Sequence, residues 1–446
     1  MSTIATAGAA RRPGDRYLML LACALAGYAI LGKGFAYLGI PPLFVGEIVL
    51  LAGCVTMLRM GGIPALFAFA PGLLLAVLMA WTLVRTLPFV PVYGMDAPRD
   101  SVIIMYGSFA FVVTALLLDD PRRLDTIVGL YDRFLLWFVP LVAVLFAISS
   151  YLRPLLPRVP GTDIPVIMMG PGEVPVHMAG AAVFVMVGFR RVRLAWILAL
   201  AAAAVMTSVL TRGGMLAFLL AVGVAAVAMG KLRQTLVALL AGGALLAAAY
   251  AAESALGESN SAAIDGKRPL SATQLVKNVG SIFGVKDPAL ESTGEWRLQW
   301  WHKIVDDTVY GDRFWDGRGF GVNLALASGY GDPRDSEPLR SPHNAHMTIL
   351  ARAGVPGAAL WFVFLALWAG TIARAFLEAR RDGEEHWAGL FLWVGCYALA
   401  CLINATFDVA LEGPMQGVWF WCLIGLGTGA AMLFRCRPRN EQKSET

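Results

Sequence analysis

The run from Trp387 to Ala405, WAGLFLWVGCYALACLINA, decides the class of fold because it holds no charged residue across its 19 positions. A transmembrane helix needs about 20 mainly apolar residues, so this run is long enough to cross a bilayer. Similar runs recur along the 446-residue chain, which is 58% hydrophobic and only 15% charged. Soluble domains usually have about a quarter of their residues charged. The sequence therefore predicts an all-α, polytopic membrane protein.

Apolar runs of this kind predict about twelve membrane spans. We expect them near 17–32, 43–58, 64–86, 101–118, 128–151, 176–190, 193–210, 213–230, 234–251, 352–374, 387–405 and 414–434. The first span follows a basic segment without a clear cleavage site, and we expect it to stay as an anchor. The chain then divides into nine spans over 1–251, one large loop over 252–346, three spans over 347–436 and a tail over 437–446.

Lysine and arginine are distributed unevenly between the two ends of these spans. With the N-terminus in the cytoplasm, most basic residues of the short loops fall inside, including the groups 190–193 and 380–381. The short outer loops then hold only Lys33, Arg85, Arg99, Arg153, Arg158 and Arg212. This positive-inside bias predicts that both termini are cytoplasmic and that the large loop is on the outer face. The net charge of +5 forms no patch that would suggest a nucleic-acid partner.

The large loop ends in a segment with candidate chemistry, SPHNAHMTILARAGVPG, from Ser341 to Gly357. An imidazole at His343 would stand between water and the membrane, where it could act as a general base on a membrane-bound substrate. The alternative is a histidine that hydrogen-bonds the backbone at a helix start. His346 follows three positions later and would share a helix face with His343. Two histidines without a third ligand make a weak metal site, so we predict no metal.

Three arginines are candidates for binding an anion. Arg212 lies between two apolar spans, against the positive-inside trend, and a charge at membrane depth often marks function. Arg297 lies in an aromatic and basic segment after Trp296 and could hold a diphosphate through charge-assisted hydrogen bonds. Arg318, in the glycine-rich turn 317–321, could add further donors. The alternatives are a snorkelling side chain, a surface ion pair and an ordinary turn, respectively.

Other side chains of the predicted outer face give weaker signals. Most of its carboxylates are expected to be solvated: Asp96, Asp100, Asp163, Glu173, Asp335, Glu337, Asp408 and Glu412. Arg99 and Asp100 are expected to form a structural pair. No paired-carboxylate, Walker, GxGxxG or HExxH pattern is present. The six cysteines lie in or beside apolar spans, which indicates packing rather than a metal site or disulfides.

The pattern His-Asn-x9-Gly-x-x-Gly at His343, Asn344, Gly354 and Gly357 resembles the signature of the O-antigen ligase and Wzy polymerase superfamily. Other segments extend the likeness. The stretch 211–214 resembles that family's arginine at a span junction, and 296–297 and 317–321 resemble its periplasmic loop. The resemblance covers most of the chain from about residue 170, and the span pattern suits the ligases best.

The resemblance implies a GT-C-like fold in a bacterial inner membrane, with a periplasmic site. The expected reaction moves a glycan from undecaprenyl diphosphate to a sugar hydroxyl of the lipid A core, without metal, nucleotide or other cofactor. His343 would be the general base, and Arg212 and Arg297 would stabilise the leaving diphosphate. The substrate-binding residues would be Asn344, which orients the loop or binds sugar, His346, which supports His343, and Trp296 and Arg318. Gly354 and Gly357 would serve helix packing.

Three other functions fit parts of this pattern. A Wzy-type polymerase would use a second lipid-linked glycan as its acceptor. A protein O-oligosaccharyltransferase often has a larger C-terminal periplasmic region, whereas about nine outer residues separate the last two predicted spans. A secondary transporter would place polar residues near the membrane midplane of two repeated halves. Here the notable charges gather at one face, and no repeat is visible.

Overall fold

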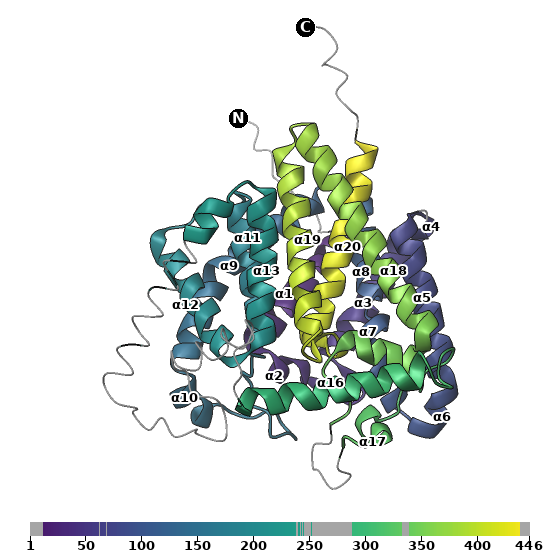
Figure 1. Cartoon of the computed structure of the whole chain (residues 1–446). Helices are drawn as coiled ribbons and strands as arrows, with labels where there is room; N and C mark the ends of the chain where they lie inside the picture. The colour runs from purple at the N-terminus through teal and green to yellow at the C-terminus, as the bar shows by residue number, and fades with distance from the viewer. Residues whose placement is uncertain are drawn as a thin grey trace, which may run out of the picture.

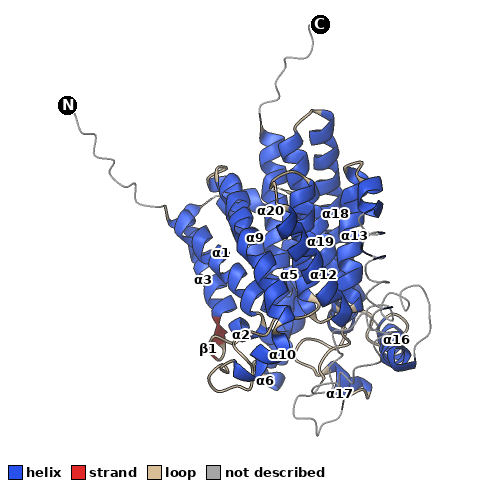
Figure 2. Cartoon of the chain, turned by 90° about the vertical axis from the view of Figure 1, so that its left-hand side faces the viewer, coloured by secondary structure: helices blue, strands red, loops and turns tan. Residues whose placement is uncertain are grey.

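A computed structural model describes residues 12–61, 63–67, 69–237, 288–331 and 339–437, with single residues at 240, 242, 244 and 251. Helices dominate it, and they stand side by side as a bundle (Figures 1 and 2). The first group is α1 (Pro13–Leu31), α2 (Lys33–Ala36), α3 (Val45–Met60), α4 (Ile63–Phe67), α5 (Ala70–Thr86), α6 (Val90–Tyr93), α7 (Asp96–Met105), α8 (Ser108–Asp119), α9 (Arg123–Ala147) and α10 (Ser149–Leu152). Two-residue strands β1 (Gly39–Ile40) and β2 (Leu43–Phe44) pair antiparallel after α2.

The second half of the chain adds the elements around the candidate site. They are α11 (Glu173–Met186), α12 (Leu194–Leu210), α13 (Arg212–Ala228), α16 (Pro288–Thr308), α17 (Leu324–Ser328), α18 (Ala345–Arg381), α19 (Glu385–Ala405) and α20 (Pro414–Cys436). Short 3-10 turns cover Leu87–Phe89, Arg153–Leu155 and Ala410–Glu412. Helix α16 lies across one end of the bundle, opposite the end where α20 finishes (Figure 1).

The predicted all-α membrane class is confirmed. Six helices among the described residues are long and apolar enough to span a membrane, and a seventh span is formed if α7 and α8, bent by 41°, count as one. Helices α11, α12 and α13 are apolar but shorter. Eleven of the twelve predicted ranges overlap a helix, while the ninth, 234–251, lies largely outside the described residues. The number twelve and the GT-C detail stay predictions.

The last two helices form the centre of the bundle. In the most apolar stretch of α20, 89% of the residues are buried, and in that of α19, 78% are buried. The share is 22–39% in the other candidate spans. Small residues allow this close packing. A Cβ atom at Gly425 of α20 would lie only 2.5 Å from the Ala110 carbonyl oxygen of α8. The turn between α19 and α20 is therefore anchored by two well-packed helices, which matters because it carries part of the candidate site.

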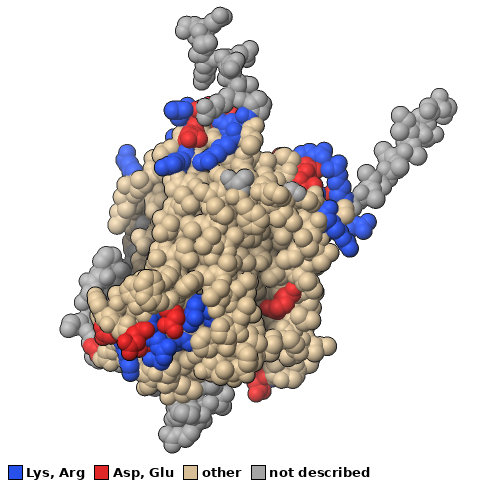
Figure 3. Space-filling model, turned by 90° about the vertical axis from the view of Figure 1, so that its right-hand side faces the viewer, with Lys and Arg blue, Asp and Glu red and all other residues tan. Residues whose placement is uncertain are grey.

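Charged side chains occupy the two ends of the bundle, and an apolar belt separates them (Figure 3). At the end away from α16, Arg123 is 3% exposed and donates to Asp15 at 2.8 Å and to Asp119 at 2.7 Å. Its Nη1 also donates to the Leu116 carbonyl oxygen at 2.9 Å. These bonds join the starts of α1 and α9 to the end of α8. Arg123, on the predicted inner side, therefore stabilises the packing of these three helices.

Candidate functional site

His343 stands immediately before α18 in an unusual backbone conformation. Its φ angle is 51°, and it is the one non-glycine residue with positive φ among those the structure describes. A side chain in this left-handed region costs on the order of 1 kcal/mol, and such strain concentrates at functional sites. The imidazole is 28% exposed, so it is reachable from solvent. The surrounding contacts hold a strained residue at the position where the sequence predicts the base.

Asn344 is the N-cap of α18. Its Oδ1 accepts hydrogen bonds from the backbone nitrogens of His346 at 2.9 Å and Met347 at 3.1 Å. Such a cap satisfies two donors that the helix start would otherwise leave unpaired. The side chain is only 3% exposed. Of the two roles predicted for Asn344, this geometry supports orienting the loop beside His343 rather than contacting a sugar.

Asp408 lies beside the imidazole, in the turn between α19 and α20. The His343 Nδ1 is 3.9 Å from the Asp408 Oδ1, and this carboxylate is 40% exposed. The distance is longer than a hydrogen bond but within the range of an ion pair if the imidazole is protonated. Catalytic contacts are often this loose before substrate binds. Asp408 therefore belongs to the candidate site, although the sequence singled it out only as an outer-face carboxylate.

Helix α16 brings Trp296 and Arg297 to the same place. The Trp296 ring meets the His343 ring edge to face, with centroids 6.4 Å apart. The Arg297 Nη1 donates to the Phe407 carbonyl oxygen at 3.1 Å, one residue before Asp408. Trp301, one turn further along α16, donates from Nε1 to the Pro342 carbonyl oxygen at 2.9 Å. Helix α16 thus places Trp296 beside His343 and Arg297 beside the turn that carries Asp408. The substrate roles of both residues stay predictions.

Arg212 is the first residue of α13, and this helix start also reaches the turn after α19. A Cβ atom at Gly213 would lie 2.8 Å from the Phe407 Cβ. A Cβ atom at Gly214 would lie 2.8 Å from the Pro175 ring and 3.2 Å from the Gly172 carbonyl oxygen. Glycine at both positions therefore permits α13 to approach this turn closely. Three elements, α13, α16 and the segment before α18, converge on residues 404–409.

Glu173 is a further carboxylate near this point. It begins α11 and is 9% exposed. A Cβ atom at the preceding Gly172 would lie 2.9 Å from the Asp408 Oδ2 and 3.0 Å from the Asn404 Oδ1, which places the start of α11 against Asp408. The expectation that Glu173 is solvated is wrong, because α11 carries it into the bundle end instead of into the loop.

His346 contacts two aromatic residues of α18. Its Nδ1 accepts a hydrogen bond from the Trp361 Nε1 at 3.0 Å, and its ring stacks on Phe362 with centroids 5.6 Å apart. His343 lies outside the helix, so the two residues do not share a helical face as the spacing suggested. The support of His343 by His346 stays a prediction. No group of three His, Cys, Asp or Glu side chains among the described residues has the arrangement of a metal site.

Arg318 lies at the other end of α16. Its Nη2 is 2.8 Å from the Asp307 Oδ2, and its Nε donates to the same oxygen at 2.9 Å. Asp307 is ten residues beyond Arg297, or about 15 Å along a helix axis. The structure therefore does not bring Arg318 to the group around His343, and the prediction that it binds the same substrate anion lacks geometric support.

A break in α18 connects the glycine-rich turn to the candidate site. Gly354 has φ 70° and ψ −176°, which divides α18 into two helical parts. A Cβ atom there would lie 2.7 Å from the Phe314 carbonyl oxygen. The backbone nitrogen of Arg318 donates to the Ala351 carbonyl oxygen at 2.7 Å, next to this break. Gly357, one turn later, packs against Trp81. The predicted packing role of both glycines agrees with these contacts.

Buried charges hold the loop against the bundle. The Asp100 Oδ2 lies 2.9 Å from the Arg352 Nη2 and 3.1 Å from the Arg340 Nη2, and the Arg352 side chain is 1% exposed. The predicted pair of Arg99 with Asp100 is wrong, since Arg99 lies 3.6 Å from Asp96 instead. The expectation that Asp100 is solvated is also wrong, because its carboxylate is only 10% exposed.

Glu412 is the third carboxylate that was wrongly expected to be solvated. Burial raises the pKa of its carboxyl, while Arg352 and a hydrogen bond from Thr348 act in the opposite direction. The Thr348 Oγ1 donates to Glu412 Oε1 at 2.8 Å, and Ser341 also hydrogen-bonds this carboxyl. Glu412 thus fixes the chain on both sides of His343, because Ser341 precedes the imidazole and Thr348 follows it.

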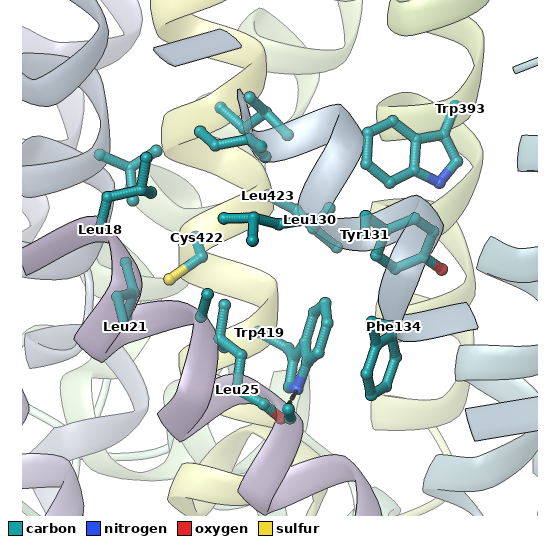
Figure 4. A pocket seen from close by; sticks show the side chains of 15 residues that line it. Leu18, Leu21, Leu25, Leu130, Tyr131, Phe134, Trp393, Trp419, Cys422 and Leu423 are labelled. Atoms are coloured by element: carbon teal, nitrogen blue, oxygen red, sulfur yellow. Dashed lines mark hydrogen bonds between the residues drawn. The ribbon is translucent and has the colours of Figure 1, made fainter. Parts of the chain in front are cut away.

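A separate cavity of about 100 Å³ lies among α1, α8, α9, α19 and α20 (Figure 4). Its walls include Leu18, Leu25 and Phe134, and the Trp419 Nε1 at its edge donates to the Leu25 carbonyl oxygen at 2.9 Å. The lining holds no carboxylate, imidazole or basic side chain. The cavity therefore offers no groups for acid–base chemistry, and the group around His343 is the stronger candidate for an active site.

Comparison with protein families gives one match. Residues 196–362 match the Wzy_C family model, described as O-antigen ligase. This match supports membership in the O-antigen ligase and Wzy polymerase superfamily for the matched part of the chain. The matched residues of this O-antigen ligase domain run from α12 into α18 and include Arg212, Arg297 and His343. No curated protein matches the chain.

Only part of the candidate site lies within the residues that match the family model. Asp408 and Glu173 lie outside the O-antigen ligase domain, yet the fold places both beside it. Members of this superfamily are glycosyltransferase-like ligases and polymerases, which supports an enzyme that acts on glycans. The chain thus combines a ligase-family segment with flanking helices that complete the surroundings of His343.

Proposed function

We propose that this protein is an O-antigen ligase that transfers a glycan from undecaprenyl diphosphate to a sugar hydroxyl of the lipid A core. The proposed site faces the periplasm and the proposed membrane is the bacterial inner membrane, with both termini in the cytoplasm. The observation that carries the proposal is the position of His343. It is held in a strained conformation 3.9 Å from Asp408, between α16 with Arg297 and the start of α13 with Arg212.

In the proposed step, the acceptor hydroxyl attacks the anomeric carbon of the donor sugar. The bond between that carbon and the diphosphate oxygen breaks, and its electron pair leaves with undecaprenyl diphosphate. His343 takes the hydroxyl proton, and Asp408 stabilises the imidazolium that forms. Because Nδ1 is the nitrogen nearest Asp408, Nε2 is the nitrogen that takes the proton. Attack opposite the leaving group inverts the anomeric centre.

Arg212 and Arg297 are proposed to hold the leaving diphosphate. Charge grows on this group as the glycosidic bond breaks, and fixed guanidinium groups stabilise such charge well. Two arginines can supply the positive charge that a divalent cation supplies in other diphosphate sites. The proposed transfer therefore needs no metal ion, and it should continue in the presence of a chelator.

The test uses purified protein, an undecaprenyl-diphosphate glycan and lipid A core. We expect glycan on the lipid A core when both substrates are present, and no product when the core is omitted. Long glycan formed without the core would instead identify a polymerase, and glycan on added protein acceptor would identify a protein oligosaccharyltransferase. Inhibition by chelator, reversed by one divalent cation, would contradict the metal-independent step.

A further inference from the structure

A second group of functional side chains lies at the far end of α16, away from His343. An open groove of about 790 Å³ runs between the last turns of α16 and the segment 311–318. Its size falls within the roughly 300–1,000 Å³ range of small-molecule sites. Six charged side chains line it: Lys303, Asp306, Asp307, Asp312, Arg313 and Arg318.

The two signs of charge are balanced in this groove, with three cations and three carboxylates. Arg318 is held by Asp307, and the Lys303 Nζ donates to the Ser328 carbonyl oxygen at 2.7 Å. These bonds fix the orientation of two of the cationic side chains in advance. A purely anionic ligand would be repelled by the carboxylates, and a cation by the basic groups. A neutral ligand with many hydroxyl groups, which both donate and accept, matches such a surface.

Two exposed aromatic side chains lie next to groove-lining residues in the sequence. Tyr310 is 81% exposed and precedes Gly311, while Trp315 is 72% exposed and lies two residues after Arg313. Large aromatic residues are usually at least half-buried, so two in one short turn with this exposure suggest a contact surface. Tyrosine and tryptophan offer rigid contact area at low entropic cost. The apolar face of a sugar ring could stack on them while its hydroxyl groups meet the charged side chains.

We propose that this groove is a saccharide subsite, separate from the group around His343. The inference rests on the proposed function, because that function supplies a glycan on both donor and acceptor. Lys303 and Asp307 are six and ten residues beyond Arg297, or about 9–15 Å along the axis of α16. A glycan whose reacting end lies at His343 could therefore extend along α16 into the groove. The occupant is an oligosaccharide of either the donor or the acceptor.

The test compares substrates of different length. Donors with one and with several glycan repeats are assayed at saturating acceptor, and full and truncated cores are assayed at saturating donor. We expect Trp315→Ala and Tyr310→Ala to raise KM for the longer substrate of one series about tenfold, which corresponds to about 1.4 kcal/mol. KM for the shorter substrate and kcat should not change. The series that responds identifies the source of the glycan.

Matched controls are available on the same molecule. Trp137, on α9, is 74% exposed, and Tyr151, on α10, is 79% exposed. Trp137→Ala and Tyr151→Ala remove as much exposed aromatic surface without touching the groove. They should leave the length dependence as in the unaltered protein. An equal response of these controls, or an equal rise in KM for short and long substrates in Trp315→Ala, would overturn the subsite.

A binding measurement separates this inference from the proposed function. Oligosaccharide released from its lipid carrier is titrated into the purified protein by calorimetry. Binding that weakens about tenfold in Trp315→Ala, but not in Trp137→Ala, supports the groove even if no transfer occurs. Transfer to the lipid A core with no difference between these variants in either binding or length dependence would retain the ligase proposal and overturn the subsite.

Discussion

At the scale of single residues, His343 combines two properties that oppose each other. Its side chain is the proposed base, yet its φ of 51° suits glycine better than any residue with a Cβ atom. Asn344 caps the next helix, and Glu412 holds the neighbouring Ser341, so the surrounding contacts impose this conformation. Strain of this kind is retained where function requires the side chain.

We therefore predict that two substitutions at this position have the same effect on transfer but differ in stability. His343→Ala and His343→Gly should both abolish glycan transfer, because both remove the imidazole. The glycine variant should be the more stable of the two by about 1 kcal/mol, since it relieves the left-handed strain that alanine keeps. Thermal unfolding in detergent and the ligation assay provide the two measurements. Transfer near the normal rate in either variant would refute the role of His343.

Arg212 allows a test of the proposed charge stabilisation. Arg212→Ala should lower kcat by about 10²–10³-fold, the size expected when one transition-state donor is lost. Arg212→Lys should recover only part of the rate, because an ammonium group keeps the charge but not the planar pair of donors. The matched control is Arg158→Ala, at an exposed ion pair with Asp163, which should keep full activity. Equal rates for Arg212→Ala and this control would show that Arg212 does not stabilise the leaving diphosphate and only lies at the membrane interface.

Residue patterns indicated part of this site and missed the rest. His343, Arg297 and Trp296 could be selected because each has an unusual local setting in one predicted loop. Asp408 could not be paired with His343, because the 64 residues between them include α18 and α19 and the contact depends on how these helices pack. The position of Glu173 near Asp408 could not be predicted for the same reason. The predicted shared helix face of His343 and His346 could not be relied on, because α18 begins after His343.

At the scale of elements, α18 shows what hydrophobic patterning can predict. The apolar run 352–374 indicated a helix, and α18 covers it. The break at Gly354 could not be predicted, because it is set by the backbone of Phe314 and Gly317 from a distant turn. Glycine alone is compatible with many conformations, and here a tertiary contact selects one.

Two glycines of α18 give a matched pair of substitutions. Gly354→Ala should destabilise the protein and lower transfer, because the new methyl group would lie 2.7 Å from the Phe314 carbonyl oxygen at a positive φ. Gly370→Ala should be neutral or stabilising by up to about 1 kcal/mol, since nothing lies within 4 Å and alanine favours helix. Thermal unfolding and transfer are compared for both. Similar stability of the two variants would show that the break is dispensable.

At the scale of the whole molecule, buried charges join the loop to the membrane helices. Asp100 in α7 meets Arg340 from the loop and Arg352 from α18. Asp100→Asn should destabilise the fold by about 3–5 kcal/mol, because it leaves buried arginines without their carboxylate. Removing both partners, as in Asp100→Asn with Arg352→Met, should cost less than the sum of the single changes. Additive losses in unfolding measurements would mean that the pair is not coupled.

The proposed orientation of the chain rests on the positive-inside bias and has a direct test. The bias places α17 on the outer face and the turn between α18 and α19 inside, next to Arg380 and Arg381. Ala327 in α17 and Glu384 in that turn are both exposed, so each can be changed to cysteine. The exposed native Cys23 and Cys436 are first replaced by serine.

A membrane-impermeant maleimide added to spheroplasts should label Ala327→Cys at once. It should label Glu384→Cys only after the membrane is made permeable, because the proposed topology separates the two positions by one crossing of α18. Detergent-solubilised protein provides the control that both cysteines can react. Labelling of both positions in intact spheroplasts, or of Glu384→Cys alone, would place the His343 site on the cytoplasmic side or show that α18 does not span the membrane. The proposed transfer in the periplasm requires the first pattern.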